Sequence, residues 1–234
     1  MQAWAHGIKH LLFDLDHTLW DCDKNSVISL ENLYNKYNLG NFFVSFDQFN
    51  EIYQKKNDEL WAILPEGKIT MLEVRRQRFI QTLQRAGITD ETLGDKLSDE
   101  YMHLMMTSGE VLPYALETLE TLHAKYEIDV VTNGVSAVQK GKMAASGIDK
   151  YVDRLFISDE VGFMKPKREY FEYVIKSLGC STDECLMIGD NPDTDIRGAQ
   201  NFGIKTIWFN SRKLVESVDA PTIADLNELV DILI

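Results

Sequence analysis

The chain contains little cysteine, which argues against a fold held together by disulfide bonds. Its 234 residues include Cys22, Cys180 and Cys185, an odd number with no C-x-x-C spacing. A disulfide framework or a zinc knuckle needs more thiols at regular, closer spacings. The sequence therefore predicts a protein of the reducing cytoplasm.

Long apolar runs and an excess of positive charge are also missing. No apolar segment of the sequence approaches the length that spans a bilayer. The formal net charge is -13, so we expect neither a membrane nor a nucleic-acid polymer as a partner. A small phosphate ester is compatible with this charge, because a metal ion and a lysine can outweigh the overall field locally.

Short apolar runs alternate with amphipathic helical patterns along most of the chain. The runs predict strands over residues 11–15, 128–132, 155–158, 186–189 and 205–209. Near-continuous apolar strands separated by helices are typical of a parallel sheet that is covered on both faces. The sequence therefore predicts the α/β class, with a doubly wound, Rossmann-like parallel sheet.

The interval between the first two strands is longer than a plain β-α-β connection, which needs about thirty residues. It shows helical patterns only, and Thr70 with Glu73 has the spacing of a capping box at the start of one helix. We therefore expect residues 20–108 to form a helical cap, inserted into a core of residues 1–19 and 109–234.

Four short stretches of the chain each end an apolar segment with acidic, hydroxyl or cationic side chains. A buried strand carries carboxylates at its end only where something offsets their desolvation, and a bound cation is the simplest offset. The four ends are Asp14-Leu15-Asp16-His17-Thr18, Thr132-Asn133-Gly134, Lys165-Pro166, and Gly189-Asp190 followed by Asp195.

The first of these ends suits hydrolysis of a phosphate ester in two steps. Asp14 would attack phosphorus and form an acyl phosphate. Asp16 would give a proton to the leaving alkoxide and later recover one from water. A D-x-D pair on an exposed loop without catalytic duty is the alternative. We expect His17 to be a turn residue at positive φ, and we assign it no catalytic role.

Two helix starts are predicted beside the other ends. Pro166 suits the first position of a helix, so Lys165 would lie at the positive end of the helix dipole, where a cation is disfavoured. An anionic neighbour explains Lys165 better than a solvated surface does. Ser136, with Gln139 three residues later, has the spacing to cap the helix that follows Gly134.

In their chain order, the four ends resemble the signature motifs of the haloacid dehalogenase superfamily of phosphatases, and the resemblance extends over residues 9–209. It implies that Thr132, Asn133 and Gly134 hold the phosphoryl oxygens. It also implies that Lys165 neutralises the nucleophile and the phosphoryl group.

The resemblance further implies a Mg²⁺ cofactor. The ligands would be the side chains of Asp14 and Asp190 and the backbone carbonyl of Asp16, which are the hard oxygen donors that this ion prefers. Asp195 is expected just beyond these ligands, where it would orient a water molecule or Lys165.

Within the superfamily, residues 14–21 and 157–162 are similar to the pyrimidine 5′-nucleotidase branch, and residues 67–79 add to this likeness. The resemblance implies a phosphomonoesterase for nucleoside 5′-monophosphates; a monomer or a homodimer is compatible with the sequence. Aromatic residues and arginines on cap helices would contact the substrate, although such residues more often pack in a core or face solvent. The candidates are Trp20, Tyr53, Trp61, Arg75, Arg76 and Arg78.

Three alternatives remain open. A phosphatase or phosphomutase for sugar phosphates in the same superfamily would have the same core. A haloacid dehalogenase also uses an aspartate nucleophile, but it needs neither a metal ion nor an acid such as Asp16. A receiver-type phosphorylation switch is also doubly wound, yet it is shorter, lacks a cap and does not carry its phosphorylated aspartate on the first strand.

Overall fold

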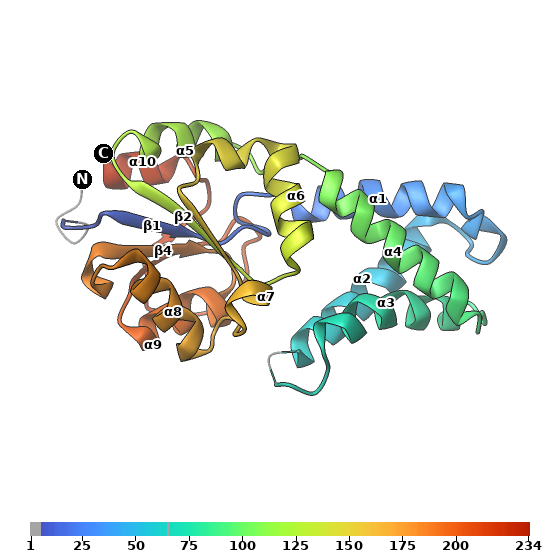
Figure 1. Ribbon diagram of the computed structural model, residues 1–234. Helices are drawn as coiled ribbons and strands as arrows, with labels where there is room; N and C mark the ends of the chain where they lie inside the picture. The colour runs from blue at the N-terminus through green and yellow to red at the C-terminus, as the bar shows by residue number, and fades with distance from the viewer. Residues whose placement is uncertain (1–5, 65) are drawn as a thin grey trace. The chain divides into compact units, whose positions relative to one another are not determined.

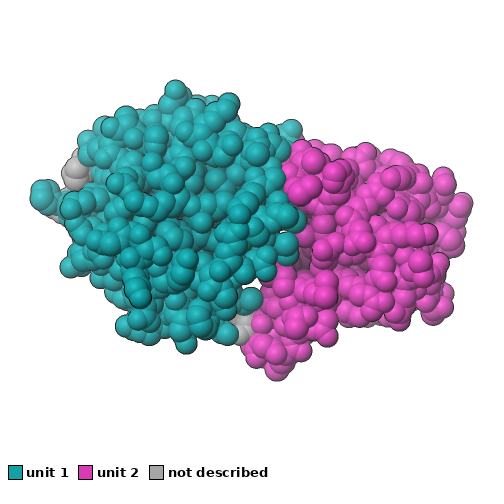
Figure 2. Space-filling model, viewed as in Figure 1, with its two compact units in different colours: residues 1–22, 109–234 teal, residues 23–108 magenta. Residues whose placement is uncertain are grey.

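The computed structural model describes residues 6–64 and 66–234, which form two compact units (Figure 1). The first unit comprises Met1–Cys22 and Gly109–Ile234, and the second comprises Asp23–Ser108; Figure 2 colours them separately. Residues 1–5, which were predicted to belong to the core, lie outside the described residues. Among the described residues, no helix is both long enough and apolar enough to cross a membrane.

The first unit is built on a six-stranded parallel sheet with the order β3-β2-β1-β4-β5-β6. The strands are β1 (His10–Phe13), β2 (Glu127–Thr132), β3 (Arg154–Ile157), β4 (Cys185–Gly189), β5 (Lys205–Phe209) and β6 (Thr222–Ile223). The predicted doubly wound α/β fold is confirmed. Strand β6 was not predicted, because two residues at a sheet edge leave no periodic pattern.

Helices cover both faces of this sheet, as Figure 1 shows. On one face lie α5 (Ala115–His123) and α10 (Glu228–Leu233), and on the other lie α8 (Arg168–Leu178) and α9 (Gly198–Phe202). The remaining elements of this unit are α6 (Ser136–Ser146), η3 (Ile148–Tyr151), α7 (Ser158–Val161), η4 (Thr182–Glu184) and η5 (Pro192–Arg197). Leu12 and Met187 pack with Tyr170 of α8 in one apolar cluster, as expected of a sheet face that helices cover.

The strand order reverses at β1, and this reversal determines where a site can form. Strand β1 pairs with β2 on one side and with β4 on the other, so that Phe13 lies opposite both Val130 and Ile188. In open parallel sheets, ligands bind beyond the carboxyl ends of the strands at such a reversal. The residues that follow Phe13, Thr132 and Gly189 therefore meet at the expected place.

The second unit, within its described residues, contains helices only. They are α1 (Cys22–Lys36), η2 (Leu39–Asn41), α2 (Phe46–Ile63), α3 (Met71–Arg85) and α4 (Glu91–Thr107). The predicted capping box at the start of α3 is confirmed: Glu73 N donates to Thr70 Oγ1 at 3.2 Å, and Thr70 N donates to Glu73 Oε2 at 2.8 Å.

Several candidate substrate contacts in this unit already have structural partners. Arg75 and Arg76 form ion pairs with acidic residues of α4. Arg78 is buried, with its guanidinium carbon 4.6 Å from the ring centroid of Tyr101, and Tyr53 packs against the same ring. These contacts favour the packing and surface roles over substrate contact.

The inserted helices leave and rejoin the first unit at one place. Asp21 N donates to the carbonyl of Glu110 at 3.1 Å, and Leu112 N donates to the carbonyl of Leu19 at 2.9 Å. An isolated antiparallel bridge joins the same two stretches. The insertion is therefore closed at its base by backbone hydrogen bonds of the first unit.

The capping box gives a test of the helical unit. Thr70→Ala removes the side-chain acceptor at the start of α3, so the free energy of unfolding should fall by about 1 kcal/mol. Urea denaturation followed by circular dichroism measures the change. Thr107→Ala is the matched control, because that hydroxyl donates only to carbonyls within its own helix turn. Equal stability of both variants would contradict the predicted role.

Candidate active site

Asp14 lies at the carboxyl end of β1, where the strand order reverses. Its backbone N–H donates to the carbonyl of Ile188 at 2.9 Å, so β1 stays paired with β4 up to this residue. The Asp14 residue is only 7% exposed. A carboxylate this buried is costly unless cationic or hydrogen-bonding groups surround it.

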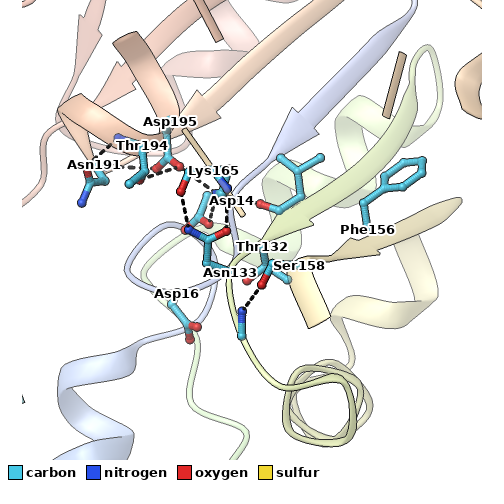
Figure 3. Close-up of polar contacts among 12 residues, drawn as sticks. Asp14, Asp16, Thr132, Asn133, Phe156, Ser158, Lys165, Asn191, Thr194 and Asp195 are labelled. Carbon is cyan, nitrogen blue, oxygen red and sulfur yellow. Dashed lines mark hydrogen bonds and ion pairs between the residues drawn. The ribbon is translucent and has the colours of Figure 1, made fainter. Parts of the chain in front are cut away.

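Lys165 is the cation beside Asp14. It is 1% exposed, and its ammonium donates to Asp14 Oδ1 at 2.6 Å, Asp195 Oδ1 at 2.7 Å and the Val131 carbonyl at 2.8 Å (Figure 3). An ammonium group has three protons to donate, and each has an acceptor here. The buried charge is therefore both paired and fully hydrogen-bonded.

The side chain of Asn133 holds the backbone of Lys165 in place. Lys165 N donates to Asn133 Oδ1, and Asn133 Nδ2 donates to the Lys165 carbonyl, both at 2.9 Å. This corrects the predicted helix start, because α8 begins at Arg168 and not at Pro166. The carbonyl of Lys165 accepts from Asn133 instead of from a helical N–H, so Lys165 and Pro166 lie in a turn before the helix.

Three buried carboxylates gather around this lysine. One oxygen each of Asp14, Asp190 and Asp195 lies within 4.8 Å of the others. Such a set of hard oxygen donors fits Mg²⁺, and Asp14 and Asp190 belong to the ligand set that the motifs imply. The carboxylate of Asp16 lies outside this cluster, so Asp16 would contribute to a metal site through its backbone carbonyl, as expected from the resemblance.

Gly189 provides the room that brings Asp195 into the cluster. A Cβ atom at position 189 would collide with the carboxylate of Asp195. Asp195 is held from its other side by Asn191 N, which donates to Oδ2 at 3.1 Å, and by the hydroxyl of Thr194, which donates to Oδ1 at 3.3 Å. Glycine is therefore required before Asp190 for steric reasons.

The cluster raises the pKa values of the carboxyl groups of Asp14 and Asp190 and of Lys165. Burial raises the pKa of Asp14, against the ammonium of Lys165, and the neighbouring carboxylates raise it further. Burial and Asp195 raise the pKa of Asp190 to about 7, although Arg212 forms an ion pair with it. Burial alone would lower the pKa of Lys165, but Asp14 and Asp195 outweigh it and hold the pKa above its ordinary value. Lys165 therefore stays charged.

Asp16 faces a different set of partners. Its Oδ1 accepts from Lys142 Nζ at 2.7 Å, and its Oδ2 accepts from Gln139 Nε2 at 2.9 Å. Figure 3 shows its carboxylate turned away from Asp14 and Lys165. Burial would raise the pKa of Asp16, but the bonds from Lys142 and Gln139 lower it overall. The predicted positive φ of His17 is confirmed at 62°.

The end of β2 carries the predicted phosphate-binding segment. Thr132 is 1% exposed, and its Oγ1 accepts from Gln139 Nε2 at 2.7 Å. Gly134 N donates to Ser158 Oγ at 3.0 Å. Both groups therefore already have protein partners, which a phosphate would have to share or displace.

The predicted capping by Ser136 and Gln139 is wrong. Helix α6 follows Val135, and no side chain of its N-cap residue caps it. Asp159 of α7 accepts from Ser136 N at 3.1 Å instead, so the acceptor comes from a neighbouring element. The side chain of Gln139 instead donates hydrogen bonds to Asp16 and Thr132. Its contacts, like those of Lys142 and Arg212, were not predicted from the sequence.

A strand-end aspartate, a buried lysine and an acidic cluster thus lie together at the reversal of a parallel sheet. The model of the haloacid dehalogenase-like hydrolases matches residues 8–203. The chain therefore belongs to this family and is an enzyme of the hydrolase class.

Similar proteins include the pyrimidine 5′-nucleotidase PynA of Streptococcus pneumoniae, 32% identical over 96% of this chain and 93% of its own. The pyrimidine 5′-nucleotidase YjjG of Escherichia coli is 31% identical over 95% of this chain and 96% of its own. Among solved structures, the HAD-hydrolase YfnB of Bacillus subtilis, described as bound to magnesium, has a TM-score of 0.87 at 30% identity. It matches 97% of this chain and 98% of its own.

The raised pKa of Asp190 predicts that Mg²⁺ binding at this cluster depends on pH. A proton on Asp190 competes with Mg²⁺, so the apparent affinity should fall about tenfold per pH unit as the pH drops below about 7. The raised pKa of Asp14 can only steepen this dependence. Titration with Mg²⁺ at several pH values measures it, with the fluorescence of Trp208 as the signal, because its Nε1 donates to the Asp190 carbonyl at 2.8 Å.

Exposed Asp193 provides the control for this titration. Asp193→Asn should leave the pH dependence unchanged, because Asp193 pairs with Arg197 on the surface. Asp190→Asn should weaken Mg²⁺ binding at every pH. An affinity for Mg²⁺ that is constant from about pH 5 to about pH 8 would contradict the assignment of Asp190 as a ligand.

Proposed function

We propose that the protein is a Mg²⁺-dependent phosphomonoesterase that hydrolyses nucleoside 5′-monophosphates, pyrimidine nucleotides in particular. The observation that carries this proposal is the buried ammonium of Lys165, which joins Asp14 to Asp195 beside Asp190. The names of PynA and YjjG support the choice of substrate. The helical unit, residues 23–108, would then act as the cap that selects the substrate.

Asp14 is the nucleophile in this proposal. Its carboxylate attacks phosphorus, the bond between phosphorus and the ester oxygen breaks, and an aspartyl phosphate forms on Asp14. Lys165 opposes the effect of burial on the carboxylate of Asp14 and stabilises the negative charge that develops on the phosphoryl oxygens. When bound, Mg²⁺ would supply further positive charge at the same oxygens.

Asp16 moves the protons. It gives a proton to the leaving alkoxide of the nucleoside in the first step. In the second step it takes a proton from water, whose oxygen attacks phosphorus and releases phosphate and free Asp14. The hydroxyl of Thr132 and the backbone N–H groups of residues 133 and 134 would orient the phosphoryl oxygens during both steps.

Removing the nucleophile tests the mechanism. Asp14→Asn should reduce phosphate release from uridine 5′-monophosphate by about a thousandfold or more, because the acyl phosphate can no longer form. Asp193→Asn, an exposed carboxylate near the site, should retain activity. Circular dichroism verifies that both variants are folded. If Asp14→Asn kept substantial turnover, the nucleophile would have to be another residue.

A substrate panel separates the nucleotidase from a sugar-phosphate phosphatase. The value of kcat/KM for uridine and thymidine 5′-monophosphates should exceed that for hexose and triose phosphates by about tenfold or more. Each assay should lose its activity in EDTA and regain it with excess Mg²⁺. A clear preference for sugar phosphates would reject the nucleotide assignment but keep the phosphatase, whereas activity in EDTA would reject the role of the metal.

A further inference from the structure

Helix α6 presents a buried lysine and a buried glutamine to the carboxylate of Asp16. Gln139 and Lys142 lie three residues apart and therefore on one face of the helix, and they are 2% and 5% exposed. Lys142 Nζ lies 4.3 Å from the ring centroid of the fully buried Trp20 and 2.7 Å from Asp16 Oδ1. The ammonium group thus lies between the aromatic face of Trp20 and the carboxylate of Asp16.

An ion pair between a buried lysine and a partly buried carboxylate is seldom kept for stability alone. Desolvating both charges costs about as much as their attraction returns, so apolar residues of similar size would stabilise the fold equally well. Val138 and Met143 on the same helix are buried and apolar, as expected of a helix that packs on a core. Lys142 departs from this pattern where it meets Asp16, which indicates a role in the reaction.

Gln139 connects Asp16 to the phosphate-binding strand end. Its Nε2 donates to Asp16 Oδ2 at 2.9 Å and to Thr132 Oγ1 at 2.7 Å. Gly134 leaves the space for this side chain, because a Cβ atom there would lie 2.9 Å from Gln139 Cδ. One amide group therefore sets the position of Asp16 relative to the hydroxyl of Thr132.

We propose that Gln139 and Lys142 are positioning residues that hold Asp16 for proton transfer to the leaving oxygen of the substrate. Lys142 retains Asp16 Oδ1, while Oδ2 takes up a proton from solvent, gives up its bond from Gln139 and donates that proton to the leaving oxygen. This inference rests on the proposed phosphatase function. Its basis is physical: proton transfer needs a carboxyl group held within hydrogen-bond reach and in a defined orientation.

The proposal predicts an effect that depends on the leaving group. Uridine 5′-monophosphate leaves as an alkoxide that needs a proton, whereas p-nitrophenyl phosphate leaves as a stabilised phenolate that does not. Lys142→Met keeps the length of the side chain but loses its charge. It should lower kcat for the nucleotide by about 10- to 100-fold and kcat for p-nitrophenyl phosphate by about twofold or less.

Two further variants make the comparison sharp. Lys140→Met is the matched control, because Lys140 lies on the same helix but is exposed and pairs with Glu160. It should not change the ratio of kcat for uridine 5′-monophosphate to kcat for p-nitrophenyl phosphate. Asp16→Asn should lower the ratio at least as far as Lys142→Met does. Adding Lys142→Met to Asp16→Asn should have no further effect, since residues that act through one group are not additive.

The outcomes separate this inference from the proposed function. Equal losses on both substrates for Lys142→Met, or an additive loss in the double variant, would overturn the positioning role and leave the phosphatase intact. No phosphate release by the unaltered protein from either ester would overturn the proposed function and the inference with it. If Lys142→Met does not fold, Gln139→Met provides the same comparison with the same criteria.

Discussion

The site depends on one ammonium group that neutralises carboxylates from two distant parts of the chain. Asp14 follows β1 and Asp195 lies in η5, and Lys165 donates to both. Without that cation, two buried negative charges would repel each other at the carboxyl end of the central strands. Two hydrogen bonds with Asn133 fix the backbone of Lys165, and the absence of a side chain at Gly189 leaves room for Asp195. Both features allow the lysine to reach the two carboxylates. The chemistry and the local fold therefore share one electrostatic constraint.

Much of the fold was predictable because its elements have strong, regular patterns. Parallel strands covered on both faces are continuous apolar runs, and β4 and β5 illustrate this most clearly. The start of α3 was predictable because a capping box is a local interaction of Thr70 with Glu73. The starts of α6 and α8 were not, because Asp159 and Asn133 act on them from other elements. A local pattern does not record such tertiary partners.

The site residues also divide into those that local sequence patterns locate and those that only tertiary contacts bring to the site. Asp14 and Asp190 follow the ends of β1 and β4 at the sheet reversal, where Lys165 and Asp195 join them, and strand patterns with short motifs are sufficient to locate all four. Asp16 meets Gln139 and Lys142 only because α6 turns one face toward it. A polar pair three residues apart, beside the apolar Val138 and Met143 of the same helix, was the available signal for these two residues. Arg212 carries no such signal, because it lies in an irregular segment after β5.

The closed base of the insertion has a consequence for the history of this fold. The chain departs after Leu19 and returns at Leu112, and these two stretches are hydrogen-bonded to each other. A segment whose two ends already meet can be lengthened, shortened or exchanged without changing the register of any strand. Changes to one continuous stretch of gene can therefore alter the helical unit, while the residues at the carboxyl ends of the strands are inherited unchanged.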